Sequence, residues 1–188
     1  NHIITGNAMT GCANWGIQLA ASSDNILADN DVKNNTSGID LHSSSNNNTL
    51  FRNNIANSTS YGLLLTDVHY NLIYHNNFTN PIPYQAICYY SNMQPFSDNN
   101  FDNGYPSGGN YWIDYHGTDL YSGPEQNMTG SDGIGDTRYV IYFTSGMLDS
   151  YPLMQPIQTF NVGTWQDKTL KIEVVSNSTL SNFNLNQT

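Results

Sequence analysis

The residues best suited to chemistry are oxygen donors in a glycine-rich stretch of the C-terminal half. Asp132 and Asp136 flank Gly133-Ile134-Gly135, and Asp119 and Asn127 come shortly before them. Closely spaced carboxylates repel one another unless a cation neutralises them, and oxygen donors on a flexible loop suit Ca²⁺ better than Mg²⁺ or a transition metal. The four residues therefore predict a calcium site. A solvated acidic turn, whose glycines serve only the backbone, is the alternative that stays open.

Three aromatic residues before this loop could bind a sugar. Tyr111, Trp112 and Tyr115 could offer flat faces to pyranose rings, with asparagine side chains supplying hydrogen bonds. Alternatively, Tyr111 and Trp112 close the end of a hydrophobic interior, because a repetitive fold needs a cap. We favour the cap, since these residues come where the repeats stop. A cell-surface glycan stays open as a partner.

The composition excludes several classes of partner. The chain has 188 residues with 5 Lys and Arg against 15 Asp and Glu, a formal charge of −10. Such a surface cannot neutralise a phosphate backbone, which excludes nucleic acid, and anionic lipid would repel it. No apolar run is long enough to span a bilayer, so we expect no direct membrane insertion. With 38% hydrophobic and 12% aromatic residues, the chain should fold rather than stay disordered.

Eight Asn-x-Ser/Thr motifs predict N-glycosylation and, together with the acidic, lysine-poor composition, an extracellular or cell-surface location. They begin at Asn34, Asn35, Asn47, Asn57, Asn77, Asn127, Asn177 and Asn186. A chain with 28 asparagines forms several such motifs by chance, so the glycosylated subset stays open. The sequence opens on Asn1 with no initiator Met and no visible signal peptide, and we expect it to be a segment of a longer protein.

A repeat of 22 to 24 residues organises the first half of the chain. Each block begins with an asparagine, has a second asparagine five residues on and an apolar residue seven on. Blocks begin at Asn25, Asn48 and Asn71, a weaker one at Asn1, and a fifth copy, Asn99-Asn100-Phe101, aligns with Asn76-Asn77-Phe78. The later half of each block is Gly16-Ile17-Gln18-Leu19, Gly38-Ile39-Asp40-Leu41, Gly62-Leu63-Leu64-Leu65 and, more loosely, Gln85-Ala86-Ile87-Cys88.

This pattern predicts an all-β fold, a right-handed, single-stranded parallel β-helix of four to five coils. Apolar and polar residues alternate over short stretches, and Gly, Asn and Ser interrupt every block, so helices are excluded. In stacked coils the asparagines would form amide ladders along the turns, where Asn tolerates left-handed backbone, and Leu27, Leu50 and Ile73 would stack inside. We expect coils over 1–102, an aromatic, Gly- and Asp-rich cap over 103–157 and a β-hairpin tail over 158–188.

The two cysteines test this arrangement. Three coil steps separate Cys12 from Cys88, which at the strand spacing is roughly 14 Å along the axis. A disulfide needs Cα atoms within about 7 Å. We therefore predict no Cys12–Cys88 bond and expect Cys88 to be a buried small hydrophobe.

Catalysis on such a fold would need groups that the coils do not bring together. A polysaccharide lyase needs a cationic base beside Ca²⁺, and Arg52 lies on a coil, but no carboxylate cluster accompanies it in the neighbouring coils. A hydrolase needs paired carboxylates about 5–10 Å apart. Asp40 aligns with Leu64 and Ile87, and Asp67 has no acidic partner one period away. We expect no catalytic residues, with a lyase or hydrolase as the alternative.

The coils resemble the parallel β-helix repeats of NosD-like proteins, also called carbohydrate-binding and sugar-hydrolysis (CASH) domains. The segment after them resembles the end of such domains in archaeal surface proteins, especially from methanogens. The similarity covers about residues 1–157. It rests most on Asn110-Tyr111-Trp112-x-Asp114-Tyr115, Gly117-Thr118-Asp119, Asp132-Gly133-Ile134-Gly135-Asp136-Thr137-x-Tyr139 and Tyr151-Pro152-Leu153-Met154. The family usually carries further acids before the Gly-Ile-Gly-Asp loop, where this chain has Met128 and Gly130.

The resemblance also suggests copper as a ligand, because NosD is associated with copper-site maturation. The five histidines are scattered, and the five methionines form no Met-x-Met pattern. This distribution argues against a copper site.

The leading hypothesis is a non-catalytic extracellular structural protein, a subunit or module of a cell-surface layer, sheath or fibre. An open strand edge at the first coil could pair with the C-terminal tail of another copy, and such a head-to-tail contact propagates rather than closes. The alternative is a carbohydrate-binding module or a polysaccharide-active fragment of a secreted protein.

Overall fold

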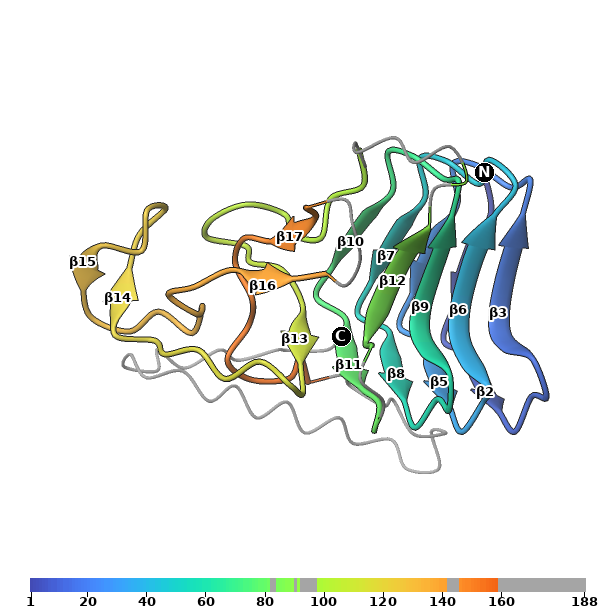
Figure 1. The fold of residues 1–188 in the computed structure, drawn as a ribbon, viewed down its shortest axis with the longest axis horizontal. Helices are drawn as coiled ribbons and strands as arrows, with labels where there is room; N and C mark the ends of the chain where they lie inside the picture. The colour runs from blue at the N-terminus through green and yellow to red at the C-terminus, as the bar shows by residue number, and fades with distance from the viewer. Residues whose placement is uncertain (82–83, 90, 92–97, 142–145, 159–188) are drawn as a thin grey trace, which may run out of the picture.

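The first half of the chain winds into a parallel β-helix (Figure 1). The computed structural model describes residues 1–81, 84–89, 91, 98–141 and 146–158. Each coil contributes one strand to each of three parallel sheets, here called A, B and C. Sheet A consists of β1 (Ile3–Thr5), β4 (Ile26–Ala28), β7 (Thr49–Phe51) and β10 (Leu72–Tyr74). Sheet B consists of β2 (Ala8–Thr10), β5 (Asp31–Lys33), β8 (Asn54–Ala56), β11 (Asn77–Thr79) and β13 (Tyr111–Trp112). Sheet C consists of β3 (Trp15–Ala20), β6 (Ser37–His42), β9 (Tyr61–Thr66) and β12 (Ala86–Tyr89).

The strand register confirms the period read from the sequence. In sheet A, Ile3 pairs with Ile26, 23 residues on, and Ile26 pairs with Thr49 after the same step. The spacing between paired residues varies in sheet C, where Ile17 pairs with Ile39 after 22 residues and Ile39 pairs with Leu63 after 24. Equivalent residues of successive coils therefore stand in rows along the axis.

Rows from all three sheets fill the interior, among them Ile39 with Leu63 and Leu41 with Leu65 in sheet C. Leu27, Leu50 and Ile73 stack in sheet A, and each is 0% exposed, as predicted. Val32, Ile55 and Phe78 stack in the same way in sheet B. Burying these side chains is the main favourable contribution to folding, at about 1.5–3 kcal/mol for each large aliphatic side chain.

Buried asparagine ladders hold the turns between the sheets. Nδ2 of Asn25 donates to Oδ1 of Asn48 at 3.0 Å, and the series continues through Asn71 to Asn99. A second ladder runs from Asn7 through Asn30, Asn53 and Asn76 to Asn110. Each oxygen also accepts the backbone N–H of the preceding ladder residue, so the ladders satisfy buried polar groups that the tight turns leave unpaired.

The left-handed backbone lies beside the ladders rather than in them. The residues before the second ladder, Asp29, Arg52 and His75, have φ of 55°, 53° and 54°. Asparagine does adopt left-handed backbone at the turns, at Asn34, Asn47 and Asn57, but none of the ladder asparagines has a positive φ. Their amides need a fixed direction along the axis, and the residue before them makes the turn.

The fifth repeat copy is shifted from its predicted alignment. Asn99 continues the ladder of Asn71, 28 residues before it, and not the ladder of Asn76. Asn110 takes the place above Asn76 instead, 34 residues on. The longer connections after β12 and Phe101 change the phase, which a fixed 23-residue spacing could not reveal.

A stack of three aromatic rings closes the interior. The Trp112 ring lies between those of Phe78 and Tyr139, with centroids 4.4 and 4.3 Å away and interplanar angles of 6° and 9°. Trp112 is only 1% exposed, so it closes the hydrophobic column as predicted for a cap. Tyr139 begins β16 (Tyr139–Val140), which pairs antiparallel with β17 (Leu148–Asp149).

Residues 118–136, here called the arm, project from the cap at the end of the molecule opposite the first coil (Figure 1). The arm contains the antiparallel strands β14 (Tyr121–Ser122) and β15 (Met128–Thr129). Its apolar side chains face solvent, with Leu120 62%, Tyr121 44% and Met128 60% exposed.

The two cysteines are free, as predicted, and Cys88 is buried. The predicted hairpin tail lies outside the described residues except for Gln158. Within the part of the chain that the structure describes, no helix has the length and hydrophobicity needed to cross a membrane.

Candidate functional site

Asp149 joins the cap to the coils. It is 0% exposed, and its Oδ2 accepts hydrogen bonds from the backbone N–H of Asn110 at 2.7 Å and from Nε1–H of Trp112 at 2.8 Å. Its Oδ1 accepts the N–H of Tyr151 at 3.1 Å. A carboxylate thus terminates the second asparagine ladder and fixes the indole of the aromatic stack.

The surroundings of Asp149 raise its pKa to about 7. Burial is the largest cause, and the nearby Asp102 carboxylate raises the pKa further. The hydrogen bonds from Asn110, Trp112 and Tyr151 oppose this effect because they favour the charged form. Gly109 leaves the space that the Asp149 carboxylate occupies, since a Cβ at this position would overlap the carboxylate oxygens.

The arm carboxylates bind the arm's own backbone. Asp119 accepts the N–H groups of Asp132 at 3.0 Å and Gly133 at 2.9 Å. Asp132 in turn accepts the N–H of Ile134 at 3.0 Å and Nε2–H of Gln126 at 3.2 Å. These bonds fix a loop that has almost no hydrophobic core.

Asp136 has the same role on the other side of the arm. It accepts the N–H groups of Leu120 and Tyr121 and the hydroxyl of Thr118 at 2.9 to 3.0 Å. Desolvation alone would raise the pKa of Asp136, but these hydrogen bonds outweigh it and the pKa is lowered. The carboxylate therefore stays charged and continues to hold the arm below neutral pH.

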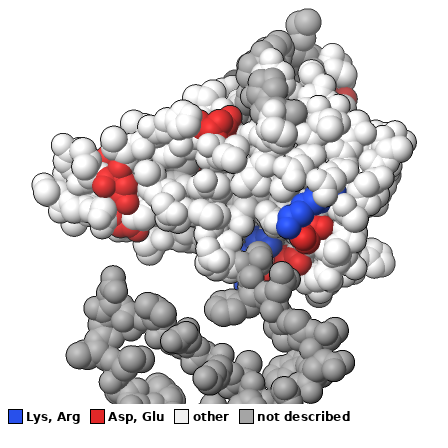
Figure 2. All heavy atoms as spheres, turned by 90° about the horizontal axis from the view of Figure 1, so that it is seen from below, with Lys and Arg blue, Asp and Glu red and all other residues white. Residues whose placement is uncertain are grey.

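The predicted calcium ligands come together in part. Asp119, Asp132 and Asp136 all lie in the arm, and Asn127 is exposed between its strands. Figure 2 shows acidic side chains at this end of the molecule, away from the basic side chains over the coils. Among the described residues, no three His, Cys, Asp or Glu form a group that could hold a metal ion. Calcium stays a prediction without support from the geometry.

The predicted sugar-binding aromatics are mostly used within the cap. Both faces of Trp112 are covered, so it offers none to a sugar. The hydroxyl of Tyr115 donates to the carbonyl of Thr137 at 2.7 Å. Tyr111 is half-buried in β13. Carbohydrate binding at these residues stays a prediction.

The structure separates the glycosylation motifs by exposure. Asn34, Asn47, Asn57 and Asn127 are exposed. Asn35 is 1% exposed, and its Nδ2 donates to the carbonyl of Met9. The amide of Asn77 makes two 2.8 Å bonds with the backbone of Ile157. Those two asparagines are therefore closed to an enzyme, while Asn177 and Asn186 lie outside the described residues.

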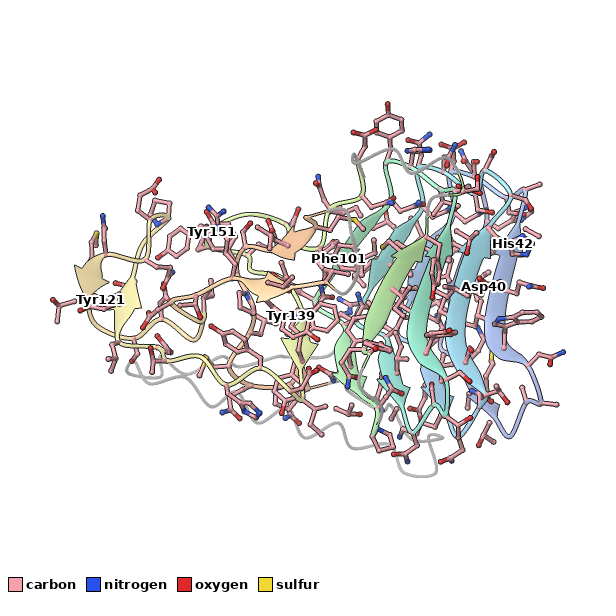
Figure 3. The ribbon with its side chains drawn as sticks, viewed as in Figure 1. Asp40, His42, Phe101, Tyr121, Tyr139 and Tyr151 are labelled. Atoms are coloured by element: carbon pink, nitrogen blue, oxygen red, sulfur yellow. The ribbon has the colours of Figure 1, made fainter. Side chains whose placement is uncertain are left out.

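The carboxylates on the coils are not arranged as a hydrolytic pair. Asp40 pairs with Leu64 in the register, as predicted, and accepts Nε2–H of Gln18 at 2.9 Å. It lies beside His42 on the outer face of sheet C (Figure 3). Asp29 forms a bidentate ion pair with Arg52, and Asp31 an ion pair with Lys33. Whether the chain cleaves a polysaccharide is not tested by this arrangement.

The residues that sequence analysis missed are those that attach the cap. The backbone N–H of Asn110 donates to Asp149 and so joins the coils to the cap. Asp102 stabilises this junction by accepting the N–H of Ser150 at 2.9 Å. The sequence did carry a signal, because Asn110 begins the first closing motif and Asp149 lies two residues before the last one. Their roles could not be derived, since 39 residues without periodicity separate them.

Residues 1–117 match a protein family described as periplasmic copper-binding protein (NosD), which covers more than half of the chain. The chain belongs to the NosD family. Among curated proteins and among solved structures, no significant match was found. NosD membership confirms the predicted resemblance and, because the family is periplasmic, the location outside the cytoplasm. The archaeal source stays a prediction.

The copper in the family's description does not fit the donors in this NosD chain. Copper prefers imidazole and sulfur ligands gathered around one ion. His42 bonds to the hydroxyl of Ser43 at 2.8 Å, and His75 bonds to the carbonyl of Ser107 at 2.6 Å, in different parts of the surface. Cys88 is buried in the core.

Proposed function

We propose that this NosD-family chain is a non-catalytic structural module of the cell exterior, a subunit of a surface layer, sheath or fibre. One observation carries the proposal. Five aspartates in the cap and at its junction with the coils accept hydrogen bonds from backbone N–H groups. Three of them, Asp119, Asp132 and Asp136, are the predicted metal ligands, and the other two, Asp102 and Asp149, lie where the cap joins the coils. Carboxylates held in this way stabilise a rigid shape and have few free lone pairs for a substrate or a metal.

The distribution of exposed apolar side chains supports self-association. Leu120 and Met128 face solvent on the arm, and Ile3, Trp15 and Ile26 are 70%, 38% and 37% exposed near the first coil. These two surfaces lie at opposite ends of the long axis (Figure 1). Contacts between unlike ends are heterologous, and heterologous contacts that do not close propagate into fibres or layers.

The arm is suited to this role because it is fixed before any contact forms. Asp119, Asp132 and Asp136 hold its backbone, so presenting Leu120 and Met128 to a second copy costs little conformational entropy. The alternative function, a carbohydrate-binding or polysaccharide-cleaving module, has less support, since Trp112 offers no ring face.

A double substitution on the arm tests the proposal. Leu120→Ser with Met128→Ser removes both exposed side chains, and we expect the mass measured by light scattering to fall to that of a monomer. Val140→Ser is the matched control, because Val140 is 66% exposed in the cap but lies off the arm. The control should associate like the wild type. Equal association of all three proteins would contradict the proposed contact.

A further inference from the structure

The twelve residues that could ligate copper are almost all placed by the structure. The chain has five histidines, two cysteines and five methionines, and only Met93 among them lies outside the described residues. Copper sites combine several of these donors around one ion. The question is therefore whether the fold brings any of them together.

In a β-helix, the register decides which side chains meet. Residues in one row on adjacent coils stand about 4.8 Å apart, so a metal site on the coils needs donors in neighbouring positions of a row. His42 pairs with Ala20, Met9 with Val32, and Cys88 with Leu65. None of these three has a copper donor at the paired position.

The donors at the turns have equally unsuitable neighbours. The carbonyl of His75 accepts the N–H of Arg52, which places a cationic residue in the adjacent coil. The N–H of Cys12 donates to the side chain of Asn35, and that of His69 donates to Asn46. A guanidinium repels a metal cation, and an amide is a poor ligand for copper.

Three of the five imidazoles, those of His42, His69 and His75, also have separate protein partners. Nδ1 of His42 lies 2.8 Å from the hydroxyl of Ser43, and its Nε2 faces Asp40 at 3.7 Å. Nε2 of His75 donates to a carbonyl at 2.6 Å, and Nδ1 of His69 faces Asp98 at 3.8 Å. Copper would have to displace a different partner at each histidine.

The sulfur donors are no better placed. Complete burial raises the pKa of the Cys88 thiol well above its usual value, so it does not supply the thiolate that copper binds. Met147 is 6% exposed within the core, whereas Met128 is 60% exposed on the arm. These sulfur ligands are thus divided between the interior and the arm.

We infer that the copper-binding description of the NosD family does not extend to this chain, whose β-helix and cap are built to fold and act without copper. The donor pairs that a copper site needs are kept apart by the same register that aligns the asparagine ladders. The family's solenoid is then a scaffold that can exist without a metal centre.

Copper titration of the purified protein tests this inference. The protein is incubated with Cu(I) or Cu(II), dialysed against a chromogenic chelator, and assayed for retained copper and for a change in melting temperature. We expect no retained copper and an unchanged melting temperature. Retention of one copper per chain with an increased melting temperature, lost in His42→Ala, His69→Ala or His75→Ala, would overturn it.

His2→Ala is the control for binding at the chain terminus. An amino group next to a histidine can bind Cu(II) in any peptide. Retention that is lost only in His2→Ala would support the inference, because the β-helix then contributes no ligand. Retention that survives all four substitutions would overturn it, since the site would lie among the sulfur donors or other groups of the fold.

Discussion

At the scale of single residues, Asp149 shows how a buried carboxylate can serve structure rather than chemistry. Its three N–H donors come from Asn110, Trp112 and Tyr151, so it links the last ladder residue, the aromatic stack and the closing segment. Burying such a charge is costly unless it is fully hydrogen-bonded. The raised pKa of about 7 shows that these bonds only partly offset the cost.

This pKa predicts a pH dependence of stability. Because the folded-state value of about 7 lies above the usual value of 3.8, the folded protein binds the proton more tightly than the unfolded chain. The resulting stabilisation is complete below about pH 4 and is lost as the pH rises through about 7. Relative to Asp149→Asn, the wild type should lose up to about 1.4 kcal/mol of unfolding free energy per pH unit in that range.

Denaturant unfolding of both proteins from acid to neutral pH measures this difference. Any pH-independent effect of the new amide on the free energy of unfolding cancels, because only the slopes of that free energy against pH are compared. Glu125→Gln is the control, since Glu125 is exposed on the arm. Parallel stability curves for the wild type and Asp149→Asn would contradict the role of Asp149.

At the scale of elements, the ladders explain the glycine that recurs in each coil. A Cβ on Gly16 would lie 2.7 Å from the amide nitrogen of Asn35, and one on Gly62 would lie 2.5 Å from that of Asn80. The glycine therefore leaves room for a ladder asparagine. The equivalent position beside Gly38 is occupied by Ser58, whose buried hydroxyl has no hydrogen-bond partner.

Ser58→Asn should complete this third ladder. The new amide would donate to Asn80, whose oxygen already accepts the N–H of Ser58, and would accept from Asn35. Gly38 leaves the space, as its counterparts do. We expect about 1 kcal/mol of added stability, measured by denaturant unfolding.

Asn53→Ser is the matched opposite change. Asn53 donates to Asn76 and to the carbonyl of Leu27, and it accepts from Asn30. Leaving these groups unpaired should cost about 1–3 kcal/mol. A destabilised Ser58→Asn together with a neutral Asn53→Ser would refute the account of the ladders.

The coils and the cap differ in how far their structure can be predicted from the sequence. The coils could be predicted because the register repeats the spacing of asparagines and apolar residues, so Leu27, Leu50 and Ile73 lie in one row. The structure of the cap could not be predicted, because the contacts that define it, such as that of Asn110 with Asp149, follow no sequence period. The acidic loop was located correctly, but its sequence does not reveal that its oxygens accept backbone hydrogen bonds.

At the scale of the whole molecule, the fold separates three tasks. The coils provide a rigid column, the cap seals it with Trp112 and Asp149, and the arm presents Leu120 and Met128 beyond the column. The labelled side chains in Figure 3 mark these parts, with Asp40 and His42 on the coils, Phe101 and Tyr139 near their junction with the cap, and Tyr121 on the arm. This division supports the proposed role as a building block.

Electron microscopy of the purified protein, with Ca²⁺ and with chelator, tests the central claim most directly. We expect ordered filaments or sheets under both conditions, because backbone hydrogen bonds already hold the carboxylates of the arm. Dissolution by chelator would place Ca²⁺ at Asp119, Asp132 and Asp136 or at a contact between copies. Dispersed monomers under both conditions would contradict a self-assembling structural role.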